Sequence, residues 1–499
     1  MISRDRQAMQ WWATVAAATL AGLALRIAAA RGGLWTDEAW SVIYAARARD
    51  AVGVFLRINH DNNHHLYSLW LQAIGMGAPP LLARLPAIVA GTLCVPLAAL
   101  VVARRSAVAG IVAAILFAVS PTMVNFGSEA RGYSLMLLAA LGLLWLAAEA
   151  VEGHERPWTP WWLALVAALG MLSHMTMAAP VVLVALWVYL ERRARFGPAM
   201  AMRDAARLMA PSLITTAGVA LFVFAAAAAS PTGMQLGGYR PFAWRDFIAA
   251  LNDLAGWTVG LDLLRNWVAP LILGVVALWI VVRPPQWLGG RARLYAILIL
   301  GVPVAAALVQ SGNSGFARYY LSSAIGLLLL ASEWAARALG GRGRIRASGA
   351  MLLAVLTLTA LWRDRELIAL QRGAPDGALA LMQRRSPNGA QVALQPKRLE
   401  GMLAVAASQT GYAIHIAKGC ARADYVFAAQ SRSAPAAAAI EHCGIPMRAI
   451  GSAVSPSLSG EAWVLYGAES LQTTGVPVSG PAPAASYRRT SGRAGVAQG

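Results

Sequence analysis

The stretch WWATVAAATLAGLALRIAAARGGLWTDEAW, residues 11–40, joins a long apolar segment to two adjacent acids. Its first twenty residues are long enough to cross the hydrocarbon core of a bilayer as a helix. Asp37 and Glu38 follow between two tryptophans, where the membrane surface is expected. Acids in such surroundings are costly to desolvate and usually mark an ion site, a cationic substrate or acid/base chemistry. The stretch therefore favours a membrane enzyme over a bare scaffold.

The composition of the whole chain indicates an integral membrane protein built from helices. Of 499 residues, 58% are hydrophobic and 13% are charged, whereas soluble domains carry about a quarter charged residues. The apolar runs are roughly 17–25 residues long and do not alternate with polar residues, which favours helices over a barrel. No cleavable signal peptide is predicted, because the first segment is long enough to span.

We expect about eleven transmembrane helices. Their predicted ranges are Trp11–Ala30, Leu85–Ala103, Val108–Val124, Ser134–Ala150, Trp158–Leu172, Met175–Leu190, Leu208–Ala228, Trp267–Val282, Leu294–Gln310, Tyr320–Ala336 and Ala347–Trp362. A further apolar segment, Leu66–Met76, is too short to cross about 30 Å of hydrocarbon. We expect it to lie at the interface or to re-enter the membrane.

The net charge of +19 comes mostly from arginines in short loops between the apolar segments. If Leu66–Met76 does not cross, the basic clusters all lie on one side, which the positive-inside rule makes cytoplasmic. The clusters are Arg4/Arg6, Arg104/Arg105, Arg192–Arg207, Arg283–Arg293 and Arg337–Arg346. We therefore expect a protein of the cell (inner) membrane with its N-terminus inside. Orientation explains the basic charge, so nucleic acid is not expected as a partner.

The chain is expected to divide into a transmembrane domain (1–362, with an outer loop at about 31–84), a small extracytoplasmic α/β domain (363–472) and a disordered tail (473–499). In the α/β domain we expect strands at Gln391–Gln395, Tyr412–Ile416, Asp424–Ala428, Met447–Ile450 and Ala462–Tyr466, and helices at Arg398–Ser408 and near Pro435–His442. Thiols oxidise outside the cytoplasm. Cys420 and Cys443 could therefore form a disulfide or remain free, whereas Cys94 lies within a span and is expected to pack there.

The remaining polar residues of interest lie on the predicted outer loops. The run NHDNNHHLY at residues 59–67 is either a solvated loop or a surface for a hydrophilic substrate. In SEARGY, residues 128–133, Glu129 and Arg131 either pair with each other, or the acid faces the first loop while the arginine binds phosphate as a fork. His174 is either a residue of a functional site or a packing residue. Arg318, in FARYY, either belongs to a functional site or extends its side chain to the membrane surface within an aromatic belt.

Some function classes are disfavoured by motifs that the sequence lacks. It contains neither G-x-x-x-x-G-K-[ST] nor G-x-G-x-x-G after a strand, which argues against an ATP-driven pump or a Rossmann nucleotide site. It also lacks a C-x-x-C pair for zinc.

In their order, these motifs resemble those of the C-type (GT-C) membrane glycosyltransferases. The closest branch is the protein mannosyltransferase and lipid A aminoarabinose transferase group, families 39 and 83. The matching motifs are the acidic pair after the first span, the polar segment ending in Leu66-Tyr67, Ala83-Arg84-Leu85-Pro86, Glu129–Tyr133, Ser173-His174 and Phe316–Tyr320. The similarity covers roughly residues 10–340.

The resemblance implies transfer of a sugar from a polyprenyl-phosphate donor to a lipid, glycan or protein acceptor outside the membrane, usually with inversion. Asp37 is then the candidate general base, and Glu38 and Glu129 are further candidate catalytic acids. The candidate donor-phosphate ligands are Arg131, Arg318, His174, His64 and His65. The candidate acceptor or sugar ligands are Asp61, Asn63, Tyr67, Tyr133 and Tyr319.

One departure from the family concerns the residues before Leu66-Tyr67. The family often has two prolines or Lys-Pro there, whereas this chain has His64-His65, and a histidine replaces a lysine on phosphate only when protonated. His64, His65, Asp37 and Glu129 also form a candidate set of ligands for a divalent metal, as in some relatives. The C-terminal domain lies outside the resemblance, and acceptor recognition is its suggested role.

Two other functions stay open at this point. A transporter or flippase of lipid-linked sugars would carry polar residues near mid-membrane in broken helices. Here they gather at one face, which favours the enzyme. A glycan polymerase or ligase would share both the face and the lipid carrier.

Overall fold

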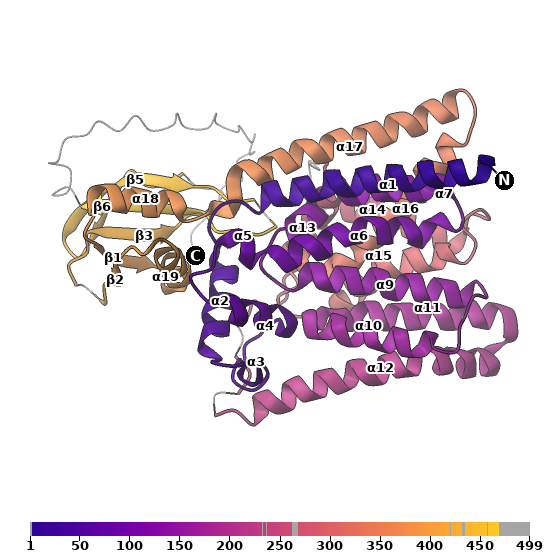
Figure 1. The fold of residues 1–499 in the computed structure, drawn as a ribbon, viewed down its shortest axis with the longest axis horizontal. Helices are drawn as coiled ribbons and strands as arrows, with labels where there is room; N and C mark the ends of the chain where they lie inside the picture. Colours follow the sequence, from indigo (N-terminus) through magenta and orange to yellow (C-terminus); the bar gives the residue numbers. More distant parts are fainter. Residues whose placement is uncertain are drawn as a thin grey trace, which may run out of the picture.

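The protein consists of a bundle of long helices, a cap of short helices at one end, and a sheet domain beyond the cap (Figure 1). The structure is a computed structural model that describes residues 2–231, 233–235, 237–261, 268–419, 421–431, 435–456 and 458–468. The N-terminus lies at the end of the bundle opposite to the sheet domain (Figure 1). The loops predicted to lie outside therefore gather at the end that carries this domain.

Each predicted span overlaps a helix, although the span predicted at Val108–Val124 is divided at Ser120 between α7 and the short α8 (Pro121–Phe126). The helices are α1 (Ile2–Ala29), α6 (Leu85–Ala103), α7 (Ala107–Val119), α9 (Tyr133–Val151), α10 (Thr159–Ser173), α11 (Ala178–Phe196), α12 (Pro198–Ala228), α14 (Val268–Val282), α15 (Arg291–Leu308), α16 (Leu321–Leu339) and α17 (Arg344–Leu370). Within the described residues, seven helices are long and apolar enough to cross a membrane, and α7 and α10 are shorter apolar helices. The predicted fold class, a helical multi-pass membrane protein, is confirmed.

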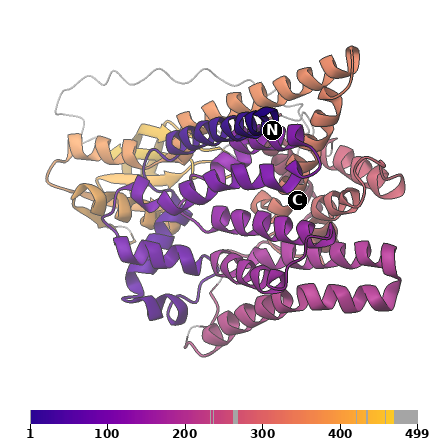
Figure 2. The same cartoon turned by 45° about the vertical axis from the view of Figure 1, so that its right-hand side comes forward.

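Small side chains let the helices of the bundle pack closely, and the long helices run side by side (Figure 2). Ala98 on α6, Ala113 on α7 and Ala140 on α9 are buried in one continuous apolar core. Small residues at helix contacts suit a lipid solvent, where close packing stabilises association. In contrast, Ile214 and Leu221 on α12 are largely exposed, as expected of side chains that face acyl chains.

The cap is formed by α2 (Thr36–Arg47), α3 (Ala51–Leu56), α4 (His65–Ile74) and α5 (Pro80–Ala83), between the bundle and the sheet domain (Figure 1). The apolar segment predicted at Leu66–Met76 is α4. Its ten residues extend about 15 Å, half of the hydrocarbon thickness. It ends at Gly75, whose φ of 77° favours glycine. The segment is therefore a cap helix, in agreement with the prediction that it does not cross.

Two further helices complete the outer end of the bundle. The helix α8 (Pro121–Phe126) precedes the second outer loop, which contains the SEARGY segment of residues 128–133. The helix α13 (Trp244–Val259) lies between the predicted spans Leu208–Ala228 and Trp267–Val282, where no helix was expected. Helix α13 packs against α8, α16 and the short η2 (Ala317–Tyr320). Other single turns are η1 (Met175–Met177), η3 (Gln371–Gly373) and η4 (Lys397–Leu399).

The C-terminal domain contains a six-stranded mixed sheet in the order β2-β1-β3-β6-β5-β4. The strands are β1 (Ala390–Gln395), β2 (Ile414–Ile416), β3 (Tyr425–Ala429), β4 (Ala439–His442), β5 (Ile445–Ala453) and β6 (Trp463–Ala468). Strand β1 runs parallel to β2 and β3, and the other pairs are antiparallel. The helices α18 (Asp376–Arg385) and α19 (Glu400–Thr410) share one apolar core with the sheet. The predicted small α/β domain is confirmed.

Several details of this domain differ from the prediction. The prediction of a helix near Pro435–His442 is wrong, because residues 439–442 form β4 and pair with β5. Strand pairing here outweighs the helical propensity of alanine. Helix α17 continues to Leu370, past the boundary expected at 363. Cys443 is disulfide-bonded, and its predicted partner Cys420 lies outside the described residues, as does the predicted tail. Cys94 is free and buried, as expected.

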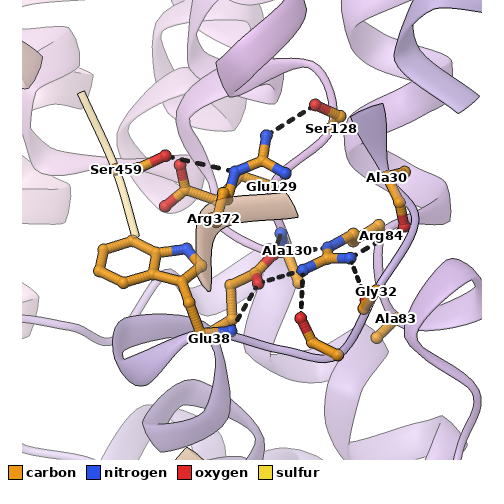
Figure 3. A network of polar contacts seen from close by, with 12 residues as sticks. Ala30, Gly32, Glu38, Ala83, Arg84, Ser128, Glu129, Ala130, Arg372 and Ser459 are labelled. Atoms are coloured by element: carbon orange, nitrogen blue, oxygen red, sulfur yellow. Dashed lines mark hydrogen bonds and ion pairs between the residues drawn. The ribbon is translucent and has the colours of Figure 1, made fainter. Parts of the chain in front are cut away.

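A buried ion pair joins the cap to the bundle. Both oxygens of Glu38 accept from Arg84, at 2.8 Å from Nε and 2.5 Å from Nη2, and neither side chain is exposed to solvent. Glu38 also accepts from the backbone N–H of Trp35 (3.2 Å) and of Ala130 (2.6 Å). The remaining guanidinium hydrogens of Arg84 point at the carbonyls of residues 30–33 (Figure 3). One pair thus ties helix α2, helix α6 and the second outer loop together.

Replacing Arg84 by Met should lower the free energy of unfolding by about 3–5 kcal/mol, because Glu38 would remain buried without its partner. The change is measured as a shift of the denaturation midpoint in detergent. Arg57→Met is the control, since its ion pair with Asp50 is half-exposed (53% and 55%) and contributes under about 1 kcal/mol. Equal shifts in the two variants would contradict a central role for the buried pair.

Candidate active site

One carboxylate and two guanidinium groups meet at the outer end of the bundle. Asp37 Oδ2 accepts from Arg131 Nη1 at 3.0 Å and from Arg318 Nη1 at 3.1 Å. These residues are predicted site residues from three different outer segments of the chain. The side chains of Asp37, Arg318 and Arg131 are 29%, 19% and 6% exposed. Asp37 and Arg318 are thus accessible from solvent, whereas Arg131 is nearly buried.

Neighbouring groups fix each guanidinium. Arg131 donates through Nη2 to Asn62 Oδ1 at 2.7 Å, and its guanidinium lies 4.9 Å from the centre of the Tyr133 ring. Arg318 lies over the rings of Phe316 (4.5 Å) and Tyr319 (5.7 Å). Such cation–π contacts hold a guanidinium in place while leaving its N–H groups available.

Several buried donors at this place find no partner among the residues that the structure describes. They are Nε of Arg131 and Nε of Arg318, and the Nε2 atom of His64 is likewise unpaired. Buried polar atoms are nearly always hydrogen-bonded, so each exception calls for a ligand, a water or a functional reason. Unpaired guanidinium donors around one carboxylate form a site suited to an oxyanion such as phosphate.

His64, Tyr133 and His174 form a stack of rings beside Arg131. The His64 and His174 rings lie 4.7 Å apart at 23°, and the Tyr133 ring lies 4.3 Å from His174. Burial lowers the pKa of His174 to about 3 and the pKa of His64 well below its ordinary value, and Arg131 acts in the same direction on both. Both histidines are therefore neutral at pH 7. They can donate one hydrogen bond each, but they add no positive charge.

The close packing of this stack depends on Gly132. A Cβ atom there would collide with the carbonyl oxygen of Ser173, the residue before His174. Glycine thus lets the loop after Arg131 touch the end of helix α10. The two predicted motifs around Arg131 and His174 therefore meet through a glycine to which the sequence analysis gave no role.

Glu129 lies behind Arg131, buried, with Oε1 3.5 Å from Arg131 Nη1. Its other oxygen finds no hydrogen-bond partner within the described residues. Burial raises the pKa of Glu129, against the opposing charges of Arg131 and Arg372. Glu129 is thus a second acid next to the site, but unlike Asp37 it is not exposed to solvent.

Four predicted site residues contact structural elements of the cap and are not bonded to Asp37, Arg131 or Arg318 among the described contacts. Glu38 is held by Arg84, and Asn63 bonds the carbonyls of Val54 and Ile58. The hydroxyl of Tyr67 donates to the carbonyl of Ala83. The ring of His65 stacks on Phe55, and burial lowers the pKa of His65 to about 4.

Asp61 and Tyr319 lie beside the site. Asp61 pairs with His60 at 2.8 Å and accepts from the backbone N–H of Gly237. Although burial acts in the opposite direction, the His60 contact lowers the pKa of Asp61. Asn62 is a further residue of the site, and it was not predicted. Asn62 bonds Arg131 and also the backbone carbonyl of Asp37. Its place within the polar run of residues 59–67 was the only available signal.

The candidate metal set does not fit this geometry. Asp37 and Glu129 face guanidinium groups, and His65 points elsewhere. In the part of the chain that the structure describes, no group of three His, Cys, Asp or Glu residues could hold a metal ion.

Residues 63–227 match a family whose description is dolichyl-phosphate-mannose-protein mannosyltransferase. The predicted resemblance to the GT-C glycosyltransferases is confirmed. The matched region of this glycosyltransferase family is less than half of the chain. It includes Glu129, Arg131 and His174, whereas Asp37 and Arg318 lie outside it.

Among solved structures, the chain is similar to the crystal structure of the Archaeoglobus fulgidus oligosaccharyltransferase tethered with an acceptor peptide via a disulfide bond. The TM-score is 0.46 and the identity 13%, over 80% of this chain and 63% of that chain. This chain thus spans less than two thirds of the length of that protein. No curated protein sequence matches the chain.

The neutral state of His174 predicts a pH-dependent stability. Below about pH 6.5 the unfolded chain takes up a proton at this histidine, while the folded protein does not until about pH 3. The free energy of unfolding is therefore highest above pH 6.5 and decreases as the pH falls. Between pH 7 and pH 5, the free energy of unfolding of His174→Asn should decrease by about 2 kcal/mol less than that of the wild type.

The measurement is the denaturation midpoint in detergent at both pH values. His415→Asn makes the same substitution at an exposed histidine and serves as the control. A wild-type pH dependence in His174→Asn would show that the folded protein binds a proton there.

Proposed function

We propose that this protein is a glycosyltransferase that moves a sugar from a polyprenyl-phosphate donor to an acceptor at the extracytoplasmic face of the cell membrane. The family match supports the transferase class. The proposal is carried by the contact of Asp37 with both Arg131 and Arg318. In this contact one acid lies beside two guanidinium groups, a combination that would suit the two ends of a sugar phosphate.

In this proposal the arginines bind the donor phosphate. When the donor enters, phosphate oxygens replace the carboxylate of Asp37 as partners of the two guanidinium groups, and the unpaired Nε donors complete the site. As the bond between sugar and phosphate breaks, negative charge grows on the departing lipid phosphate, and fixed cations stabilise it. Neutral His64 and His174 supply hydrogen bonds rather than charge.

Asp37, released from the arginines, acts as the general base for the acceptor hydroxyl. The hydroxyl loses its proton to Asp37 while its oxygen attacks the anomeric carbon from the face opposite to the phosphate, which inverts that carbon. The partly exposed position of Asp37 suits an acceptor that arrives from outside the membrane. The basic clusters at the other end of the bundle and the disulfide-bonded Cys443 support this orientation.

Asp37→Asn should reduce transfer by about 10²–10⁴-fold, because the amide cannot accept the proton. The assay incubates purified protein with a panel of polyprenyl-phosphate sugars and identifies the product by mass spectrometry. Asp5→Asn makes the same change of charge at the opposite, exposed end of α1 and should leave transfer unchanged. Wild-type turnover in a folded Asp37→Asn variant would remove Asp37 as the base.

Arg318→Ala should reduce turnover of the lipid-linked donor by about 10²–10³-fold, the usual effect of losing one donor to a developing oxyanion. Arg318→Lys should retain part of the activity, because charge remains but the fork is lost. The matched control is Arg365→Ala, which also removes an arginine lying over an aromatic ring, at 5.2 Å from Trp362. If both alanine variants behave alike, Arg318 acts only as an interface anchor.

A further inference from the structure

Arg372 lies in the connection between helix α17 and the sheet domain, and its side chain is fully buried. It donates to the carbonyl of Ala29 at 2.9 Å, to the carbonyl of Asn125 at 2.7 Å and to the hydroxyl of Ser128 at 2.7 Å. A single guanidinium thus joins the end of helix α1 to both ends of the short segment that precedes Glu129 and Arg131. Figure 3 shows its bond to Ser128.

The sheet domain holds Arg372 in this position. Ser459 accepts from Arg372 Nε at 3.3 Å and donates to Asn125 Oδ1 at 2.9 Å. The backbone N–H of Glu461 donates to the carbonyl of Arg372 at 3.1 Å, and Trp463 Nε1 donates to the carbonyl of Gly373 at 2.9 Å. Both the side chain and the backbone of Arg372 are therefore fixed by residues of the C-terminal domain.

The local backbone is unusual in a way that suits this role. Arg372 has a φ of 55°, in the left-handed region that residues other than glycine rarely adopt. At the next position, a Cβ on Gly373 would collide with the carbonyl oxygen of Glu461. Backbone of this kind persists only when the surroundings impose it, and it is concentrated at functional sites.

The second outer loop is consequently held on both sides. On one side, Glu38, which is paired with Arg84, accepts from the backbone N–H of Ala130. On the other side, Arg372 bonds Asn125 and Ser128, and Ser459 bonds Asn125. Arg131, which contacts Asp37, directly follows Ala130. A shift of the segment between residues 125 and 130 would therefore move the guanidinium of Arg131 relative to Asp37.

We propose that Arg372 is a positioning residue through which the C-terminal domain holds the loop of residues 125–131, and with it Arg131, in the geometry needed for transfer. This inference rests on the proposed function. It assigns the domain a part in building the donor site, in addition to any contact with the acceptor. The domain must be docked for Arg131 to be in place.

The test compares Arg372→Gln and Ser459→Ala with the wild type in two measurements. Backbone hydrogen exchange should increase at residues 125–132 in both variants, by more than in the rest of the bundle. The folded fraction of Arg372→Gln should show kcat/KM lowered about 10–100-fold, since a misplacement of about 1 Å at a reacting group can cost a factor of 10². Ser459→Ala removes one contact without changing charge, and should show a smaller loss.

Arg384→Ala is the matched control, because it removes an exposed arginine of the same domain, whose Nε donates to the carbonyl of Ala380 within helix α18 at 3.3 Å. Two results would overturn the proposal. One is hydrogen exchange at residues 125–132 that increases no more in Arg372→Gln than in this control. The other is a wild-type kcat/KM in folded Arg372→Gln. The exchange measurement needs no donor. Failure of the wild type to use any polyprenyl-phosphate sugar would thus contradict the proposed function, while the exchange result still decides on Arg372.

Discussion

A fully buried guanidinium group is costly unless its charge and its N–H groups find partners, and this constraint organises the outer end of the protein. Arg84 and Arg372 are both fully buried, and each collects backbone carbonyls from segments that are distant in the chain. Removing either would leave several carbonyls or a carboxylate without a partner, which costs more than the interaction itself contributes. Arg131 and Arg318 differ from these two arginines, because the Nε atom of each finds no partner within the described residues.

The helical fold was largely predictable, because long apolar segments in lipid have few alternatives to a helix. The site was predictable only to within a residue. Asp37 reaches the arginines while the adjacent Glu38 binds Arg84, and Asn62 reaches Arg131 while Asn63 bonds the scaffold. Neighbouring side chains point in different directions, and the deciding partner of Glu38 lies 46 residues away. No local pattern contains that information, and the same applies to the pairing that turns residues 439–442 into a strand.

The arrangement also bears on the choice between an enzyme and a transporter. The charged residues of the site come from the first turn of α2, the loop after α8 and the turn η2, all at the end of the bundle that carries the sheet domain (Figure 1). A carrier that moves a polar headgroup across the bilayer needs polar groups along its path. Chemistry at one face needs only a fixed cluster there, and the family match agrees with that interpretation.

The way in which the sheet domain is attached limits how the protein can be re-engineered. Residues 371–374 and 459–463 interlock through the close approach of Gly373 to Glu461 and through the bonds of Ser459 and Trp463. A chimera that grafts a foreign domain after α17 would need to bring a matching pair of segments, whatever the rest of its sheet looks like. Sequence change is thus free to occur on the distant strands, while this junction changes only as a unit.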